Sequence, residues 1–474
     1  MKHRFLLTLS AFVLAVSLWA QGQAKYVFYF IGDGMGVNQV NGTQTYLAAL
    51  EGRIGITPLC FTRFPVCGLV TTFSGTNGVT DSAAAGTALA TGRKTGNHVL
   101  GMLADEQTPV TSVAQWAHEA GAAVGVSTSV SVDHATPAAF YAHVADRNAY
   151  HQIGNQLPDA GFDFYAGSDF RKPAGAEGEA DTYERCREAG YTVVRGYKAY
   201  AKAAKKAQRM VLLQPEKPSH GDRTCLPYAI DRQQDDLTLT DITRAGLSFL
   251  MSKQGEKQGF FLMVEGGKID YACHANDAAT VFHETIDMDE AVRVAYEFYM
   301  QHPDETLIVV TADHETGGIV LGRGPYELHL DVLKYQKLSA EAYTAHLRDL
   351  HTKLGDKLTW ERMKQDLTEY WGFWKGVSLN QHQSERLENA YKAFISGKDK
   401  GASNMYANLG GIADAARRTL AEIALVGWQS GGHSNGYVPV FAIGVGAERF
   451  GGQIDNTQIP LRIAEAAGWQ QTAQ

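Results

Sequence analysis

The chain has 474 residues, of which 45% are hydrophobic and 20% are charged, a balance typical of soluble globular proteins. This length is enough for one large α/β domain with an insertion, or for two or three ordinary domains. The formal net charge of -8 argues against nonspecific binding to nucleic acid or anionic lipid, which are themselves negative. Local cations would therefore have to hold any phosphate-bearing ligand.

The N-terminus has the parts of an export signal. Lys2 and Arg4 form a basic head, residues 5–19 are nearly all apolar, and Ala20 offers a small residue for cleavage. We therefore expect 1–20 to be a signal peptide and the mature protein to be periplasmic or secreted. An uncleaved anchor is the alternative, but an apolar run of about fifteen residues is too short to span a bilayer comfortably. No later stretch is apolar enough for a second span.

Several short apolar runs, rich in β-branched and aromatic residues, end abruptly in polar or Gly-rich sequence. Such runs are typical of strands buried on both faces. Helical stretches lie between them, and this alternation predicts an α/β fold with a mostly parallel central sheet and helices on both faces. The predicted strands lie at 26–31, 260–264, 307–310 and 438–443, and two of the predicted helices lie at 81–91 and 277–299.

Between residues 323 and 426 the sequence changes character. This stretch is dense in Leu, Lys, Glu and aromatic residues at helical spacing, which predicts a mostly helical insertion. The catalytic core would then consist of 21–322 and 427–474. Whether the insertion caps the site or builds a subunit contact is not decided by the sequence.

Acidic and imidazole side chains follow the predicted strands. Asp33 and Glu265 each come at the end of one run, and the pair Asp313-His314 follows another. Ligands of open α/β sheets bind at the carboxyl ends of the strands. A lone Asp before Gly is usually a turn former, but this repeated placement predicts a binding site at one edge of the sheet.

Further candidate ligands flank these positions. Asp270 and His274 are four residues apart and share one face if the segment is helical, and His433 lies in a Gly-rich stretch before the last predicted strand. Carboxylate and imidazole without thiolate suits zinc where histidines gather and magnesium where only oxygens are offered.

Ser82 is the candidate nucleophile, because it starts a predicted helix of small residues where N–H groups favour anions. No Gly-x-Ser-x-Gly elbow surrounds it, so a nearby metal rather than a histidine base would activate its hydroxyl. A simple N-cap role for Asp81 or Ser82 is the alternative.

Taken together, these motifs resemble those of the alkaline phosphatase family across nearly the whole mature length. The matching segments are 32–36 (GDGMG), 81–84 (DSAA), 134–139, 265–274, 313–318 and 432–433. The resemblance implies hydrolysis of small phosphate monoesters to alcohol and inorganic phosphate through a phosphoserine at Ser82. It also implies a possible homodimer, with no nucleic-acid partner and no membrane span after signal removal.

The resemblance further implies a site with two Zn²⁺ and one Mg²⁺. Arg147, eleven residues after Thr136, would clamp the phosphoryl oxygens with its planar guanidinium. The implied ligands are Asp270, His274 and His433 for one zinc, Asp33, Asp313 and His314 for the other, and Asp33, Thr136 and Glu265 for magnesium.

Two positions depart from part of the family. His134 stands where some members have Asp, and Tyr271 follows Asp270 where a cation occurs elsewhere. An imidazole organises magnesium-bound water less strongly than a carboxylate, so the third site has either magnesium or zinc as its expected occupant. We place both residues beside the metals rather than among their ligands.

Three alternatives stay open on the sequence. A phosphodiesterase, sulfatase or phosphonate hydrolase would share the metal core, although the sulfatase motif of Cys or Ser followed by x-Pro-x-Arg is missing at Ser82. An inactive secreted binding protein is less consistent with a full set of candidate ligands. A dinucleotide-binding protein is the third alternative, but the Gly-rich stretch 32–36 lacks the last Gly of that fingerprint.

The five cysteines allow more than one arrangement in an oxidising compartment. Pairs Cys60–Cys67 and Cys186–Cys225 are feasible, but sequence alone does not fix connectivity. Without a C-x-x-C motif, no ribbon-type zinc site is expected, and Cys273 is expected to be a small buried residue.

Overall fold

The structure is a computed structural model that describes residues 22–176, 178–218, 223–254, 257–403, 406 and 408–470. The predicted signal peptide, 1–20, lies outside these residues. Within the described chain, no helix is both long and apolar enough to cross a membrane.

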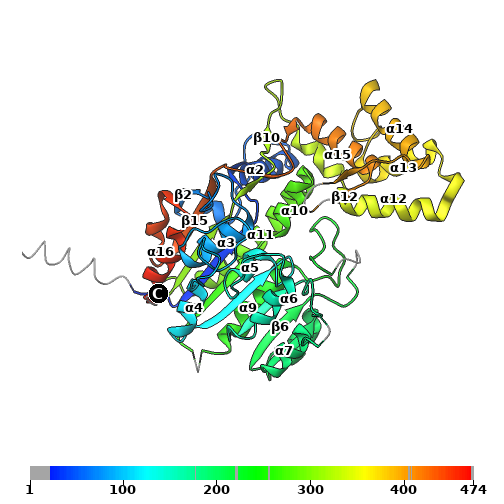
Figure 1. Cartoon of the computed structure of the whole chain (residues 1–474). Coiled ribbons are helices and arrows are strands. Elements are labelled where there is room, and N and C mark those ends of the chain that lie inside the picture. Colours follow the sequence, from blue (N-terminus) through cyan, green and yellow to red (C-terminus); the bar gives the residue numbers. More distant parts are fainter. Residues whose placement is uncertain are drawn as a thin grey trace, which may run out of the picture.

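A ten-stranded sheet forms the centre of the molecule and confirms the predicted mostly parallel arrangement (Figure 1). All neighbouring strands in it are parallel except those on either side of β15, which runs antiparallel to both β8 and β2. In spatial order the strands are β16 (Gly452–Asp455), β2 (Val66–Thr71), β15 (Val438–Gly444), β8 (Thr306–Thr311), β1 (Tyr26–Ile31), β7 (Phe260–Glu265), β3 (Ala123–Thr128), β4 (Phe164–Gly167), β6 (Arg209–Leu213) and β5 (Tyr191–Arg195).

The four strands predicted from apolar runs, β1, β7, β8 and β15, lie in the middle of this sheet. Every residue of β1, β7 and β8 is buried, as expected for strands covered on both faces. The two predicted helices are also present, as α3 (Ser82–Thr91) and α11 (Ala278–Tyr299).

Helices cover both faces of the sheet, as predicted. One layer joins α9 and α11 to α2, and the other joins α3, α4, α5 and α16, with contacts from both layers to the central strands. Their bounds are α2 (Val37–Leu50), α4 (Val113–Glu119), α5 (Ala135–Ala138), α9 (Leu239–Met251) and α16 (Gln458–Ala467), and shorter helices α6 (Tyr150–Gln156), α7 (Thr182–Glu188) and α8 (Tyr197–Ala203) lie toward the β5 edge.

Between the predicted insertion boundaries, helices form a group of their own to one side of the sheet (Figure 1). They are α12 (Ala340–Leu354), α13 (Trp360–Trp371), α14 (Gln381–Ile395) and α15 (Gly411–Ala424), and α14 and α15 contact each other. Strands β10 (Val320–Leu321) and β13 (Val426–Gly427) pair antiparallel, so the chain leaves and re-enters at neighbouring points. A short hairpin, β11 (Ala402–Ser403) with β12 (Asn408–Leu409), was not expected. The division of the chain into core and insertion stays a prediction.

None of the five cysteines forms a disulfide in the structure, so neither feasible pairing is present. Cys67 is exposed on β2, and Cys273 is buried as expected. Cys225 instead contacts the buried ammonium group of Lys268, with 3.2 Å between Sγ and Nζ.

Candidate active site

The strand register brings the predicted acidic residues to one edge of the sheet. Ile31, the last residue of β1, lies beside both Glu265 of β7 and Thr311 of β8. Asp33 and Asp313 each follow two residues after the end of their strand, so both project at the edge where Glu265 ends β7. Gly34 permits this close approach: its φ is 73° and a Cβ there would lie 2.9 Å from Asp270 Cα. Its N–H donates to Asp313 Oδ1 at 3.1 Å.

The antiparallel direction of β15 carries His433 to the same edge. Since β15 runs opposite to β8, the segment before its first residue meets the carboxyl ends of the parallel strands. Two short strands hold this segment in place, β14 (His433–Ser434) and β9 (Glu315–Thr316), with His433 opposite Thr316. Asp270 and His274 occupy α10 (Lys268–His274), which starts three residues after β7.

Three groups of side chains among the described residues could each hold a metal ion. Within each group, every residue offers one donor atom, and these atoms all lie within 4.8 Å of one another. His274 adds to the group that contains Asp270 and His433, since its Nε2 lies 3.2 Å from both Asp270 Oδ2 and His433 Nε2. Most predicted ligands therefore gather in one buried centre. The groups are Asp33, Asp313 and His314; Asp270, His314 and His433; and Asp33, His134 and Glu265.

Hydrogen bonds at Nδ1 orient three of the imidazoles. Nδ1 lies 2.6 Å from the Gly431 carbonyl oxygen in His274 and 2.8 Å from the Thr80 carbonyl oxygen in His433. A carbonyl can only accept, so Nδ1 carries a proton in both rings, and Nε2 is the nitrogen that faces the centre, with a lone pair whenever the ring is neutral. His314 bonds Thr316 Oγ1 through Nδ1 at 3.1 Å. Such outer partners are typical of histidines that ligate metals.

Asp33, Asp313 and Glu265 are buried so close together that their ionised forms need a compensating cation. Burial, together with the negative charges of Asp313, Asp270 and Glu265, raises the pKa of Asp33 well above its usual value. Burial likewise raises the pKa of Glu265 to about 7. Among the described residues, neither oxygen of Asp33 nor Asp313 Oδ2 has a hydrogen-bond partner. Buried charges of one sign require pairing or a metal, so these residues fit a group of divalent cations.

Thr136 lies on α5, two residues after His134 in sequence, and lines the same centre. Its hydroxyl and that of Thr128 partly offset the rise in the pKa of Glu265. Thr128 donates to Glu265 Oε2 from the end of β3. Sequence reasoning missed Thr128, although it ends a buried strand in register with Glu265.

Ser82 is placed at the first turn of α3, against this centre. It is buried, and its Oγ lies 3.2 Å from His314 Nε2. Asp81 is the N-cap of α3 and accepts from the Ala84 N–H at 3.0 Å. The cap and the candidate nucleophile are therefore adjacent residues with separate contacts.

Arg147 points at the same end of α3. Its Nη1 donates to Asp81 Oδ2 at 3.0 Å, and its Nη2 donates to Tyr406 Oη at 3.1 Å. Nη2 also lies 3.4 Å from His134 Nε2. The guanidinium, 6% exposed, is thus fixed beside Ser82 by partners from two distant parts of the chain.

Tyr406 is a site residue that sequence reasoning missed. It belongs to the β11–β12 hairpin of the predicted insertion, yet its ring stacks on Tyr271 with 4.4 Å between centroids and 6° between planes. Its ring centroid also lies 5.9 Å from that of His134 and 5.2 Å from that of His274. Nothing near Tyr406 in the sequence resembles a motif, and only the folded chain brings it here.

An α/β sheet with a buried carboxylate and imidazole centre at its carboxyl edge, facing a serine at a helix start, defines a class of metal-dependent hydrolase sites. The family model described as "Alkaline phosphatase" matches residues 24–172 and 174–469. The chain therefore belongs to the alkaline phosphatase family.

Individual relatives agree with this assignment. Alkaline phosphatase 3 of Bacillus subtilis is 30% identical over 457 residues, which cover 94% of this chain and 89% of the relative. The human tissue-nonspecific isozyme is 30% identical over 61% of this chain and 63% of its own length.

Two solved structures are also similar to this one. The cold-active alkaline phosphatase of a psychrophilic Shewanella has a TM-score of 0.77 at 27% identity, covering 93% of this chain and 99% of its own. The alkaline phosphatase of Thermus thermophilus has a TM-score of 0.75 at 29% identity, covering 94% and 92%. Membership of the family supports a phosphatase activity.

Proposed function

We propose that this protein hydrolyses phosphate monoesters through a covalent phosphoserine at Ser82. The observation that carries the proposal is the position of Ser82 Oγ, 3.2 Å from His314 Nε2 at the rim of the carboxylate and imidazole centre. A serine hydroxyl is a weak nucleophile unless its proton is withdrawn, and this placement puts it beside His314, a proposed ligand of the cation that would lower the pKa of the hydroxyl.

The residues present suit two zinc ions and one magnesium ion. Asp270, His274 and His433 would hold the first zinc. The second would be held by Asp33, Asp313 and His314, and magnesium by Asp33, Thr136 and Glu265. When bound, these ions stabilise the attacking and leaving oxygens of an in-line displacement and neutralise the phosphoryl charge.

His134 makes the third position unlike a site of oxygens alone. It offers an imidazole nitrogen within 4.8 Å of carboxylate oxygens of Asp33 and Glu265. Imidazole suits zinc better than magnesium. We propose that this position accepts either ion and that His134 sets the balance.

The chain's own groups supply the rest of the chemistry. Arg147 binds two phosphoryl oxygens through its planar fork, and the N–H groups at the start of α3 face the same oxygens. Ser82 Oγ attacks phosphorus, its bond to phosphorus forms as the ester P–O bond breaks, and the alcohol departs with a proton. Water then attacks the phosphoserine, releasing inorganic phosphate and restoring the Ser82 hydroxyl.

The compartment and assembly belong to the same proposal. We propose export to the periplasm or the medium, on the strength of the predicted signal at 1–20. We also propose a homodimer, which sizing of the mature protein in solution tests.

The test is nitrophenol release from p-nitrophenyl phosphate and its bis ester between pH 8 and pH 10, before and after EDTA, with zinc and magnesium added back. We expect strong monoester turnover that EDTA removes and the metals restore. Preference for the bis ester would instead make the protein a phosphodiesterase. No turnover of either ester would favour the inactive binding protein.

A further inference from the structure

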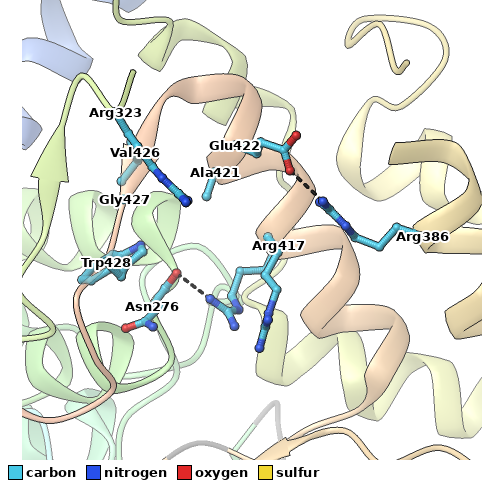
Figure 2. Close-up of a pocket in the computed structure, with 10 residues that line it drawn as sticks. Asn276, Arg323, Arg386, Arg417, Ala421, Glu422, Val426, Gly427 and Trp428 are labelled. Carbon is cyan, nitrogen blue, oxygen red and sulfur yellow. Dashed lines mark hydrogen bonds and ion pairs between the residues drawn. The ribbon is translucent and has the colours of Figure 1, made fainter. Parts of the chain in front are cut away.

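A pocket lined by four arginines lies where the helices α14 and α15 meet the loops of the core. Its volume is about 450 Å³, within the range of small-molecule sites. Figure 2 shows the side chains of Arg323, Arg386 and Arg417 directed toward a common space, with Trp428 on the core side. Arg418 completes the set of arginines.

The carboxylates around this pocket do not balance its arginines. Asp414 pairs with both Arg417 and Arg418, and Glu422 pairs with Arg386 at 2.8 Å. Arg323 makes no ion pair with any residue that the structure describes, and its side chain lies against Gly427. Four arginines of the described chain therefore line the pocket with two carboxylates as their ion-pair partners, an excess of two positive charges.

Two buried donors in the pocket wall also lack acceptors. Arg417 is 7% exposed, and its Nη1 donates to the Asn276 carbonyl oxygen at 3.1 Å. Its Nε, like the indole N–H of Trp428, is buried without a hydrogen-bond partner among the described residues. Unsatisfied buried donors cost free energy, and an anionic ligand that reached them would remove that cost.

We propose that this pocket is a second anion site, which binds ligands with two or more adjacent phosphoryl groups. Arginine forks match phosphoryl oxygens two at a time, and the excess charge and the volume both exceed what one phosphate needs. The shared chemistry of such ligands is a phosphoryl chain, found in inorganic polyphosphate and in nucleoside diphosphates. This site is separate from Ser82 and does not depend on the proposed reaction.

The pocket nevertheless shares its walls with segments that carry candidate metal ligands. Asn276 follows His274 by two residues, and Trp428 precedes His433 in the segment before β15. A ligand in the pocket would therefore contact the same loops that position the two imidazoles. This placement suits a site that senses or retains polyphosphorylated compounds next to a phosphatase centre.

The test is calorimetric titration of the metal-loaded protein with methylenediphosphonate, whose P–C–P bridge resists hydrolysis. We expect a binding event that is weakened about 10-fold or more by Arg323→Ala and by Arg386→Ala, since each removes hydrogen bonds to a charged ligand. Arg147→Ala should leave that event unchanged, which separates it from the catalytic centre. Arg187→Ala, an exposed arginine on α7, is the matched control.

Two further experiments identify the ligand and test whether the variants are correctly folded. Adenosine 5′-(α,β-methylene)diphosphate binding more tightly than the diphosphonate, with the gain lost in Trp428→Leu, would assign a nucleotide, whereas equal binding would assign the phosphoryl chain alone. Nitrophenyl phosphate turnover should stay within about twofold of wild type in Arg323→Ala. The proposal is overturned if Arg323→Ala and Arg386→Ala both bind the diphosphonate as tightly as the wild type does. It is also overturned if citrate, an anion without phosphoryl groups, binds the wild type more tightly than the diphosphonate does.

Discussion

Ser82 and Arg147 are positioned by groups that have no direct part in the proposed reaction. Asp81 caps α3 through the Ala84 N–H and also accepts from Arg147 Nη1. One carboxylate thus fixes the start of the helix and the guanidinium beside it. A negatively charged cap also suits the positive end of the helix dipole, which explains why Asp rather than Ser or Asn fits position 81.

Replacing the nucleophile tests the mechanism most directly. Ser82→Ala should lower kcat by at least about 1000-fold, because it removes the hydroxyl that we propose forms the phosphoenzyme. Zinc content measured by elemental analysis should stay near the wild-type value, since none of the proposed ligands changes. Trapping at acid pH with a labelled monoester should yield no phosphoprotein, and normal turnover would disprove the assignment of Ser82.

The clamp role of Arg147 predicts a change in specificity as well as in rate. Arg147→Ala should weaken inhibition by inorganic phosphate by about 10- to 100-fold, because hydrogen bonds to a charged group are lost. The ratio of monoester to diester turnover should also fall, because Arg147 would compete for the space that a second ester group needs, and the variant removes it. Arg147→Lys keeps the charge without the fork and should fall in between. An unchanged ratio in Arg147→Ala would count against the clamp.

At the scale of elements, the β11–β12 hairpin connects the predicted insertion to the site. Tyr406 is not among the proposed metal ligands, but its hydroxyl accepts from Arg147 Nη2 and its ring stacks on Tyr271. The hairpin therefore helps to hold the guanidinium and closes one side of the centre. This favours the capping role over a purely subunit-binding role for the insertion.

Removing a single hydroxyl tests this connection. Tyr406→Phe should raise the inhibition constant of phosphate about 2- to 10-fold, the range for one hydrogen bond, with little change in kcat. Tyr391→Phe is the matched control, because Tyr391 lies in the same insertion and its hydroxyl donates to the Leu358 carbonyl oxygen at 2.7 Å. Equal phosphate inhibition in the two variants would show that the hairpin has no positioning role.

The sequence predicts the central elements well and the peripheral ones poorly. Strands β1, β7, β8 and β15 are mostly apolar because both of their faces are covered, and this leaves a clear pattern. The hairpin β11–β12 has two residues in each strand, which is too short for any periodicity. The antiparallel direction of β15 could not be predicted either, because the apolar residues of a buried strand do not indicate the direction in which it runs.

At the scale of the whole molecule, the candidate site draws on separate segments that meet only in the fold. Placement at the ends of predicted strands pointed to Asp33, Glu265 and the pair Asp313-His314. The resemblance to the family was needed for Thr136 and Arg147. Tyr406 and Thr128 have no such signal, and the closeness of His134 to Asp33 and Glu265 depends on side-chain geometry. Local pattern therefore reveals the ligand types, whereas the surrounding contacts require the three-dimensional structure.

The concentration of acid groups predicts how metal removal changes stability with pH. The pKa of Glu265 is raised from 4.5 to about 7, and those of Asp33 and Asp313 are raised as well, chiefly by burial. In the metal-free fold, a raised carboxyl pKa contributes stability that is fully present below pH 4.5 and is lost as the pH rises to about 7. Bound cations replace the protons, so the metal-loaded fold escapes this loss.

The free energy of unfolding that metal binding adds should therefore grow from pH 5 to pH 7. Each carboxyl group with a raised pKa should contribute about 1.4 kcal/mol per pH unit between its unfolded and folded pKa values. Burial keeps the pKa values of His134 and His314 well below the usual range, so these imidazoles have no proton to release over this range. Thermal unfolding with EDTA or with zinc and magnesium, at pH 5, 6, 7 and 8, measures the difference in Tm. In Glu265→Gln this difference in Tm should rise less steeply with pH. A difference in Tm that shrinks as the pH increases would mean that cations do not occupy this carboxylate cluster.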